Sequence, residues 1–114
     1  MRAWSAALNT DDNAAAGRLF APGALVTQGG AVYELRGAAD AARWTASLPC
    51  SGHIVDVQVV QETVTAVFIL GNRPQSRCDA PPGTRAAARF TIRSGKIVGW
   101  EQLPVPGAEE SPET

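Results

Sequence analysis

Four residues of this sequence have side chains that could take part in acid–base chemistry from a β-sheet, three as acids or bases and one as a fixed positive charge. Asp56 is the one carboxylate inside a long apolar, β-branched stretch, and Glu101 lies in the last apolar stretch of the chain. His53 is the sole histidine, and Arg89 alternates with apolar neighbours. A carboxyl group that loses its water has a raised pKa and can act as a general acid or base. Two carboxylates that flank an arginine can also open an epoxide with water, and Asp56, Arg89 and Glu101 supply those residue types.

A structural role competes with a chemical one at Asp56 and His53. Asp56 shares its strand face with Gln58, and carboxylates are seldom buried without a partner. We therefore expect a solvated side chain there, or one at a dimer interface. His53 opens the same strand with no acidic pair nearby, which favours a position at the surface over a role as a base.

The direction of Glu101 depends on the turn at Ser94-Gly95. A two-residue turn pairs Ala88 with Glu101, whereas a three-residue turn pairs Ala88 with Trp100. Side chains alternate between the two faces of a strand, so only one of Trp100 and Glu101 can face the interior. The sequence by itself leaves both orientations open.

Cys50 and Cys78 are the only cysteines, and their spacing matches no zinc or redox motif, so no metal site is expected. If Val60 pairs with Thr63 across a tight turn, both cysteines reach the same end of the sheet. A disulfide is feasible at that distance. Two reduced thiols are the alternative, because cytosolic proteins rarely keep disulfides, and an oxidised bond would argue for export from a longer precursor.

The composition is that of an ordinary globular protein. The 114 residues carry a net charge of −1, and the length suits one domain over residues 1–104 with a flexible acidic tail over 105–114. The ten basic residues are scattered, so we expect no nucleic-acid partner. Because no apolar run approaches the ~20 residues that span a bilayer and no signal-peptide core opens the chain, we expect no membrane partner and a cytoplasmic location. No cofactor motif is present.

The hydrophobic periodicity predicts an α+β order in which helices are segregated from an antiparallel sheet. Short helices are expected from Trp4 to Leu8 and from Asp12 to Phe20, and a third from Ala38 to Leu48, which Pro49 stops. Strands follow from period-two alternation and turn residues. They are expected over 24–28, through Tyr33 and Leu35, and over 53–60, 63–71, 85–93 and 96–103.

Two stretches carry a resemblance to known proteins. WSAALNTDDNAAAGRLFAPGALV resembles the opening of ketosteroid isomerases and SnoaL-like polyketide cyclases, and ARFTIRSGKIVGWEQL is similar to the closing hairpin of the same nuclear-transport-factor-2-like superfamily. The resemblance implies a cone-shaped roll: three N-terminal helices on a curved mixed, mainly antiparallel sheet, with a central pocket. It also favours Trp100 and Gln102 as the residues that face inward.

The resemblance does not bring the isomerase chemistry with it. Ketosteroid isomerases use a tyrosine, a strand aspartate and a second, protonated aspartate. The matching positions hold Trp4, Gln28 and Ala88, of which an indole can donate a hydrogen bond but no residue can move a proton near neutral pH. A ketosteroid isomerase of the usual kind is therefore excluded.

Three functions remain, from different classes. The first is a protein that binds a small apolar molecule in the cone. The expected pocket residues share inward-facing positions in the resembled fold, and core filling is the alternative for any one of them: Trp4, Gln28, Tyr33, Trp44, Ala88, Phe90, Trp100 and Gln102. The second is a non-catalytic module that forms a homodimer through the outer sheet face, for example through Val67. The third is a hydrolase or isomerase that uses Glu101 or Asp56.

Overall fold

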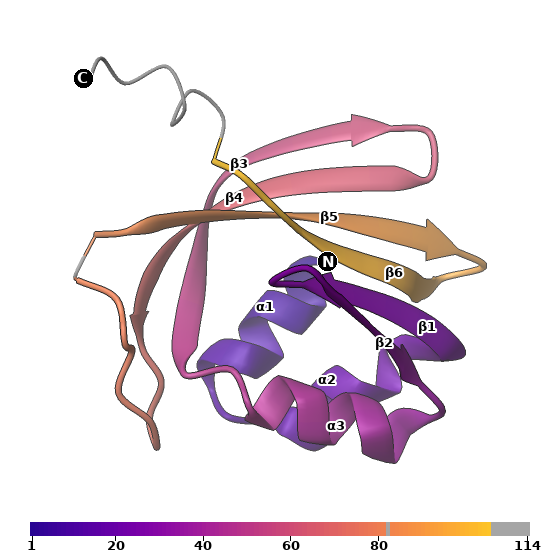
Figure 1. The fold of residues 1–114 in the computed structure, drawn as a ribbon, viewed down its shortest axis with the longest axis horizontal. Coiled ribbons are helices and arrows are strands. Elements are labelled where there is room, and N and C mark those ends of the chain that lie inside the picture. Colours follow the sequence, from indigo (N-terminus) through magenta and orange to yellow (C-terminus); the bar gives the residue numbers. More distant parts are fainter. Residues whose placement is uncertain (82, 106–114) are drawn as a thin grey trace.

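The computed structural model describes residues 1–81 and 83–105, which form three helices and six strands (Figure 1). In chain order they are α1 (Arg2–Asn9), α2 (Asn13–Arg18), β1 (Phe20–Gln28), β2 (Ala31–Leu35), α3 (Ala38–Ala46), β3 (Cys50–Val60), β4 (Thr63–Asn72), β5 (Arg85–Arg93) and β6 (Lys96–Leu103). The predicted tail lies outside the described residues, apart from Val105. None of the helices within the described ranges is long and apolar enough to cross a membrane.

The six strands form one mixed sheet in the order β2-β1-β6-β5-β4-β3. Neighbouring strands are antiparallel except β1 and β6, which run parallel. The sheet curves round the three helices without closing, so that its two ends are edge strands (Figure 1). The predicted α+β cone with a curved, mainly antiparallel sheet is therefore confirmed.

Two predicted helix ends were wrong, each for a different physical reason. Phe20 was expected to end the second helix, but it begins β1, where it pairs with Ile97. The backbone N–H of Ile97 also donates to the carbonyl of Leu19, which draws the chain into the sheet. The third helix ends at Ala46 rather than Leu48, because the residue before Pro49 is pushed away from helical geometry.

The β3–β4 hairpin has the predicted turn but a shifted register. Val60 pairs with Thr63 as expected, and a bulge at Val55 then displaces the pairs further along the strands. The first residue of β3 is Cys50, opposite Asn72, so this strand begins three residues earlier than predicted. The long strand brings Cys50 to the loop that follows β4.

The pairing of residues in the β5–β6 hairpin determines which of them face inward. This pairing differs from both of those predicted from the length of the turn. The turn is the two-residue one, with Arg93 opposite Lys96, but an extra residue at Val98 shifts the pairs beyond it. Ala88 therefore pairs with Gln102, and not with Trp100 or Glu101.

Helix packing relies on one close backbone approach and on side-chain hydrogen bonds to β3. A Cβ atom on Gly17 would lie 2.4 Å from the carbonyl oxygen of Ala38, so only glycine lets α2 and α3 touch. Helix α1 is fixed to β3 by Asn9, whose amide oxygen accepts from the N–H of Gly52 at 2.8 Å while its Nδ2 donates to the Gly52 carbonyl at 3.0 Å. The Ser5 hydroxyl donates to the same carbonyl at 2.8 Å. These contacts hold the helices over the concave face of the sheet.

Candidate functional site

A cavity of about 260 Å³ opens at the end of the cone where β3 begins and β4 ends. Its walls come from α1, from the end of β1, from the turn after α3, from β3 to β6 and from the loop that follows β4. The lining residues are mostly apolar: Trp4, Leu8, Gln28, Leu48, Pro49, Cys50, Ser51, Gly52, Phe68, Leu70, Asp79, Ala86, Ala87, Ala88, Trp100 and Gln102. Asp79 is the one ionisable side chain among them.

An aromatic cluster fills the part of the cone interior beside this cavity. The ring centroids of Trp44 and Trp100 lie 4.9 Å apart and those of Trp4 and Phe90 lie 5.4 Å apart, both in edge-to-face arrangements. Such pairs contribute about 0.5–1.5 kcal/mol each beyond the burial of area. The indole N–H groups of Trp4 and Trp100 are buried without a hydrogen-bond partner among the described residues. This region is therefore packed core, and the open space begins at its edge.

The structure divides the expected pocket residues into three groups. Trp4, Gln28, Ala88, Trp100 and Gln102 line the cavity. Tyr33, Trp44 and Phe90 lie outside its wall.

Tyr33 and Trp44 border a second and more open hollow of about 330 Å³, together with Gln28, Glu34 and Asp40. The indole N–H of Trp44 donates to the side-chain oxygen of Gln28 at 3.3 Å, so this pair stands between the two spaces. Phe90 borders neither space, since it is 0% exposed within the cluster.

The candidate acids lie on the opposite face of the sheet from the cavity. Glu101 lies between two lining residues of β6, and its carboxylate pairs with Arg89 at 3.2 Å, with both side chains nearly half exposed. Asp56 is exposed opposite Val67, and His53 is exposed opposite Ile69. The structure thus brings Glu101 and Arg89 together but places neither of them, nor Asp56, on the cavity wall.

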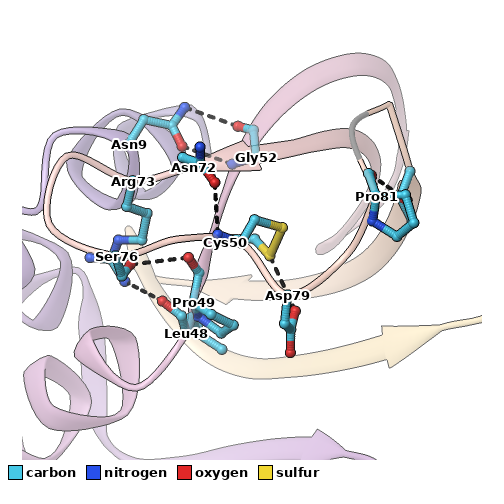
Figure 2. The surroundings of a disulfide bond; sticks show 12 residues. Asn9, Leu48, Pro49, Cys50, Gly52, Asn72, Arg73, Ser76, Asp79 and Pro81 are labelled. Carbon is cyan, nitrogen blue, oxygen red and sulfur yellow. Dashed lines mark hydrogen bonds between the residues drawn. A yellow bond between two sulfur atoms is a disulfide. The ribbon is translucent and has the colours of Figure 1, made fainter.

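A disulfide and the aspartate beside it lie at the mouth of the cavity, and the predicted set of pocket residues did not include them. Cys50 and Cys78 form a disulfide, with their Cα atoms 4.3 Å apart. The sequence alone left open whether these residues form a disulfide or remain reduced thiols. Asp79 follows directly, and its Oδ1 lies 3.5 Å from Cys50 Sγ (Figure 2). The sequence held the signal, because the pairing of the cysteines implies that the loop after β4 meets the start of β3.

The same three residues are the one group in the described ranges that could approach a metal ion together. Metal ligation by cysteine requires the thiolate, and both sulfurs are committed to the disulfide. Asp79 would be left as a single carboxylate ligand. The described residues therefore offer no set of metal ligands in the oxidised protein.

The loop after β4 is anchored at its start by Arg73, whose side chain is 1% exposed. Its Nε lies 2.7 Å from Asp11 Oδ1, and its Nη1 donates to the carbonyls of Thr45 and Leu48 at 2.7 Å each (Figure 2 shows the Leu48 contact). Its Nη2 donates to Asn13. One buried guanidinium thus ties the loop to the end of α3 and to the segment that joins α1 and α2.

The fold and the cavity together define an α+β cone protein of the nuclear-transport-factor-2-like kind. The profile of the SnoaL-like domain family matches residues 1–100, and the chain belongs to that family. No curated protein matches the sequence.

Several solved structures share the fold. A protein from Sinorhizobium meliloti, provisionally named a polyketide cyclase, is 22% identical over 88% of this chain and 89% of its own, with a TM-score of 0.69. A nuclear-transport-factor-2-like protein of unknown function from Cytophaga hutchinsonii is 12% identical over 90% and 83%, with a TM-score of 0.72. A hypothetical protein from Catenulispora acidiphila with a ketosteroid isomerase-like fold, in complex with trimethylamine, is 20% identical over 94% and 85%, with a TM-score of 0.71. At these identities the likeness concerns the fold alone.

Proposed function

We propose that this protein binds a small, mostly apolar molecule in the cavity beside the tryptophan cluster. The observation that carries the proposal is the cavity wall, on which apolar side chains surround an open space and one charged group, Asp79, lies at the mouth. Ligand sites generally combine apolar walls with a few polar groups that fix orientation. Gln28, Ser51 and Gln102 are the other polar side chains on the wall.

The size of the cavity limits the ligand. Its volume of about 260 Å³ lies just below the ~300–1,000 Å³ that is usual for ligand pockets, and equals about nine water volumes. A compact molecule therefore fits better than a large polycyclic one. Asp79 disfavours anionic ligands, whereas a small amine would meet a carboxylate and the side chains of Trp4 and Trp100. The trimethylamine complex of the Catenulispora relative supports including such amines among the compounds tested.

Catalysis by Glu101 or Asp56 finds no support in this geometry, since a general acid or base must reach the proton that it moves. Both carboxylates lie across the sheet from the cavity, and Glu101 is paired with Arg89. Among the described residues, Asp79 is the carboxylate on the wall of this cavity.

Ligand-dependent stabilisation tests the proposal. Thermal unfolding is measured with compact terpenoid epoxides, aromatic polyketides, steroids and small amines, and a ligand at 100 times its Kd should stabilise the fold by about 2.7 kcal/mol. Ala86→Leu narrows the cavity and should reduce that shift by more than half. Arg85→Leu changes the neighbouring residue on the outer face and should leave it intact. Equal shifts in both variants would show that the ligand binds elsewhere, and no shift with any compound would count against a binding function.

We also infer that the protein works where disulfides persist. The Cys50–Cys78 bond is formed between half-buried sulfurs that a reducing cytosol would reach. Non-reducing mass spectrometry of the protein isolated from its native cells tests this inference. A mass two hydrogens higher than that of the oxidised chain would contradict it.

Dimerisation is a second candidate, favoured by apolar side chains on the edge strand β3. Val59 and Val60 are 65% and 66% exposed at the end of the β3–β4 hairpin, which extends past the helices (Figure 1). Val67 is a poorer choice for a test than the sequence suggested, because it is only 7% exposed within one chain. Sedimentation velocity should show a dimer that Val60→Lys, on the outer sheet face, dissociates and that Val32→Lys, on the opposite edge strand β2, leaves intact. A monomer at high concentration would contradict this candidate.

A further inference from the structure

Gln28 is a polar residue of the cavity wall whose side-chain amide is held by a hydrogen bond. It is the last residue of β1, and it borders both the cavity and the second hollow. Val26 pairs with Trp100 of β6, so Gln28 lies beside Gln102, two residues further along each strand, on the same inner face. The Gln28 amide is therefore part of the surface that a molecule in the cavity would meet.

The hydrogen bond from Trp44 determines which end of this amide faces which way. An indole N–H can only donate, and that of Trp44 lies 3.3 Å from Gln28 Oε1. A flipped amide would set its own N–H groups against the indole N–H, so the oxygen must face Trp44. The indole cannot easily follow a rotated amide, because its ring centroid lies 4.9 Å from that of Trp100 and 5.8 Å from that of Phe20. The Gln28 amide thus has one favoured orientation.

The nitrogen of the amide is left as a donor without an acceptor in the described part of the chain. Among the described residues, the hydrogen bond that the Gln28 side chain makes is the one that its oxygen accepts. Unlike the indole nitrogens of Trp4 and Trp100, which are buried without a partner, Gln28 Nε2 is not sealed in the core. It therefore presents its N–H groups to open space.

We propose that Gln28 selects ligands with a neutral carbonyl oxygen, which accepts a hydrogen bond from Gln28 Nε2. Trp44 borders the second hollow but not the cavity. The oxygen arm of the amide is therefore turned toward the hollow, and the nitrogen arm toward the cavity. The apolar part of the ligand then lies against Ala88 and Trp100, which line the same cavity. This assignment rests on the proposed binding function and adds the chemical class of the ligand.

Charge separates a neutral carbonyl from the other groups that a ligand could offer. Asp79 would repel a carboxylate or a phosphate, and among the described residues no lysine or arginine lies on the cavity wall to offset that repulsion. An ammonium group would be attracted by Asp79 but has no lone pair for the Gln28 N–H groups. A hydrocarbon would leave these N–H groups without an acceptor. Compact ketones, esters and lactones therefore match the wall best.

Three probes that share one bicyclic skeleton test the assignment. Norcamphor carries a ketone, norbornane carries no polar group, and 2-aminonorbornane carries an ammonium group. Their dissociation constants are measured near neutral pH by titration of the oxidised, isotope-labelled protein, followed by NMR of its backbone and side-chain N–H groups. A ketone loses more hydration than a hydrocarbon when it is buried. The quantity to compare between variants is therefore the ratio of the Kd of norbornane to the Kd of norcamphor.

Gln28→Glu keeps an oxygen for the Trp44 N–H but replaces the amide nitrogen with a second oxygen. The Kd ratio should fall about three- to tenfold, since one net hydrogen bond is lost, and 2-aminonorbornane should bind more tightly to the added carboxylate. Gln58→Glu makes the same chemical change on the outer sheet face and should leave the ratio unchanged. Gln28→Met removes the donor without adding a charge. It should lower the ratio to a similar degree, and it covers the case in which Gln28→Glu does not fold.

The N–H signals report where the ketone binds. Norcamphor should shift the side-chain amide signals of Gln28 and the backbone signal of Ala88, and should leave Tyr33, which borders the second hollow, unchanged. A shift at Tyr33 in place of Ala88, undetectable binding of norcamphor, or an unchanged Kd ratio in folded Gln28→Glu or Gln28→Met protein would each overturn the assignment. Each of these results leaves the ligand-binding proposal standing, since that proposal fails only when no compound of the wider panel shifts thermal unfolding.

Discussion

Removing the Cys50–Cys78 disulfide should cost this fold a large part of its stability, by an amount that the chain length between the cysteines fixes. The two residues are 28 positions apart. Closing a loop of that length lowers the entropy of the unfolded chain by about 12 cal/mol/K, which is about 3.6 kcal/mol near room temperature. Whole domains are stable by only about 5–15 kcal/mol, so the Cys50→Ser/Cys78→Ser variant should stay folded with a much reduced margin.

Thermal and urea unfolding followed by circular dichroism measure this loss. At about 2.1 cal/mol/K of unfolding entropy per residue, a loss of about 3.6 kcal/mol lowers the Tm by about 15 °C. Oxidised wild-type protein should lose the same amount on reduction, whereas the double variant should not respond to reductant. A loss below about 1 kcal/mol would refute the reasoning, because it would mean that the bond does not restrict the unfolded chain as a 28-residue loop should.

Three further substitutions test the contacts that hold the helices and the loop. Arg73→Met should lower the free energy of unfolding by about 3–5 kcal/mol, because it leaves the Asp11 carboxylate unpaired, and Arg73→Met/Asp11→Leu should recover part of the loss in urea titrations. Gly17→Ala should cost at least about 1–3 kcal/mol through the clash with Ala38, while Gly37→Ala, with nothing within 4 Å, should stay within about 1 kcal/mol in the same assay; equal losses would contradict the close-packing explanation. Asn9→Ala should cost about 1–3 kcal/mol and speed hydrogen exchange at the Gly52 amide, and an unchanged exchange rate would show that Asn9 does not protect that amide.

The sequence determined the order of the elements and the class of the fold. Helical spacing at Trp4 and Leu8, period-two alternation from Arg85 to Arg93 and the turns at Gln61-Glu62 and Ser94-Gly95 are local signals, and each gave an element of the expected type in the expected place. The cysteine pairing was accessible as well, because the hairpin between them brings both to one end of the sheet.

Tertiary structure alone decided the register, because single extra residues are invisible to a period-two pattern. The bulges at Val55 and Val98 are set by how the curved strands fit their neighbours, and the second of them pairs Ala88 with Gln102. Phe20 joined β1 rather than α2 for a similar reason, since its partner Ile97 lies far along the chain.

The candidate site shows the same division between local pattern and three-dimensional packing. The resemblance favoured inward positions for Trp100 and Gln102 and matched Trp4 to a pocket position, but it could not show that Phe90 would be sealed in core while Asp79 reached the cavity mouth. A charged residue in a loop is normally exposed to solvent. Arg73 is buried instead, because a carbonyl of α3 and the Asp11 carboxylate both contact its guanidinium. Residue types and spacing fixed what the chain could form. Long-range packing fixed which of those side chains meet an open space.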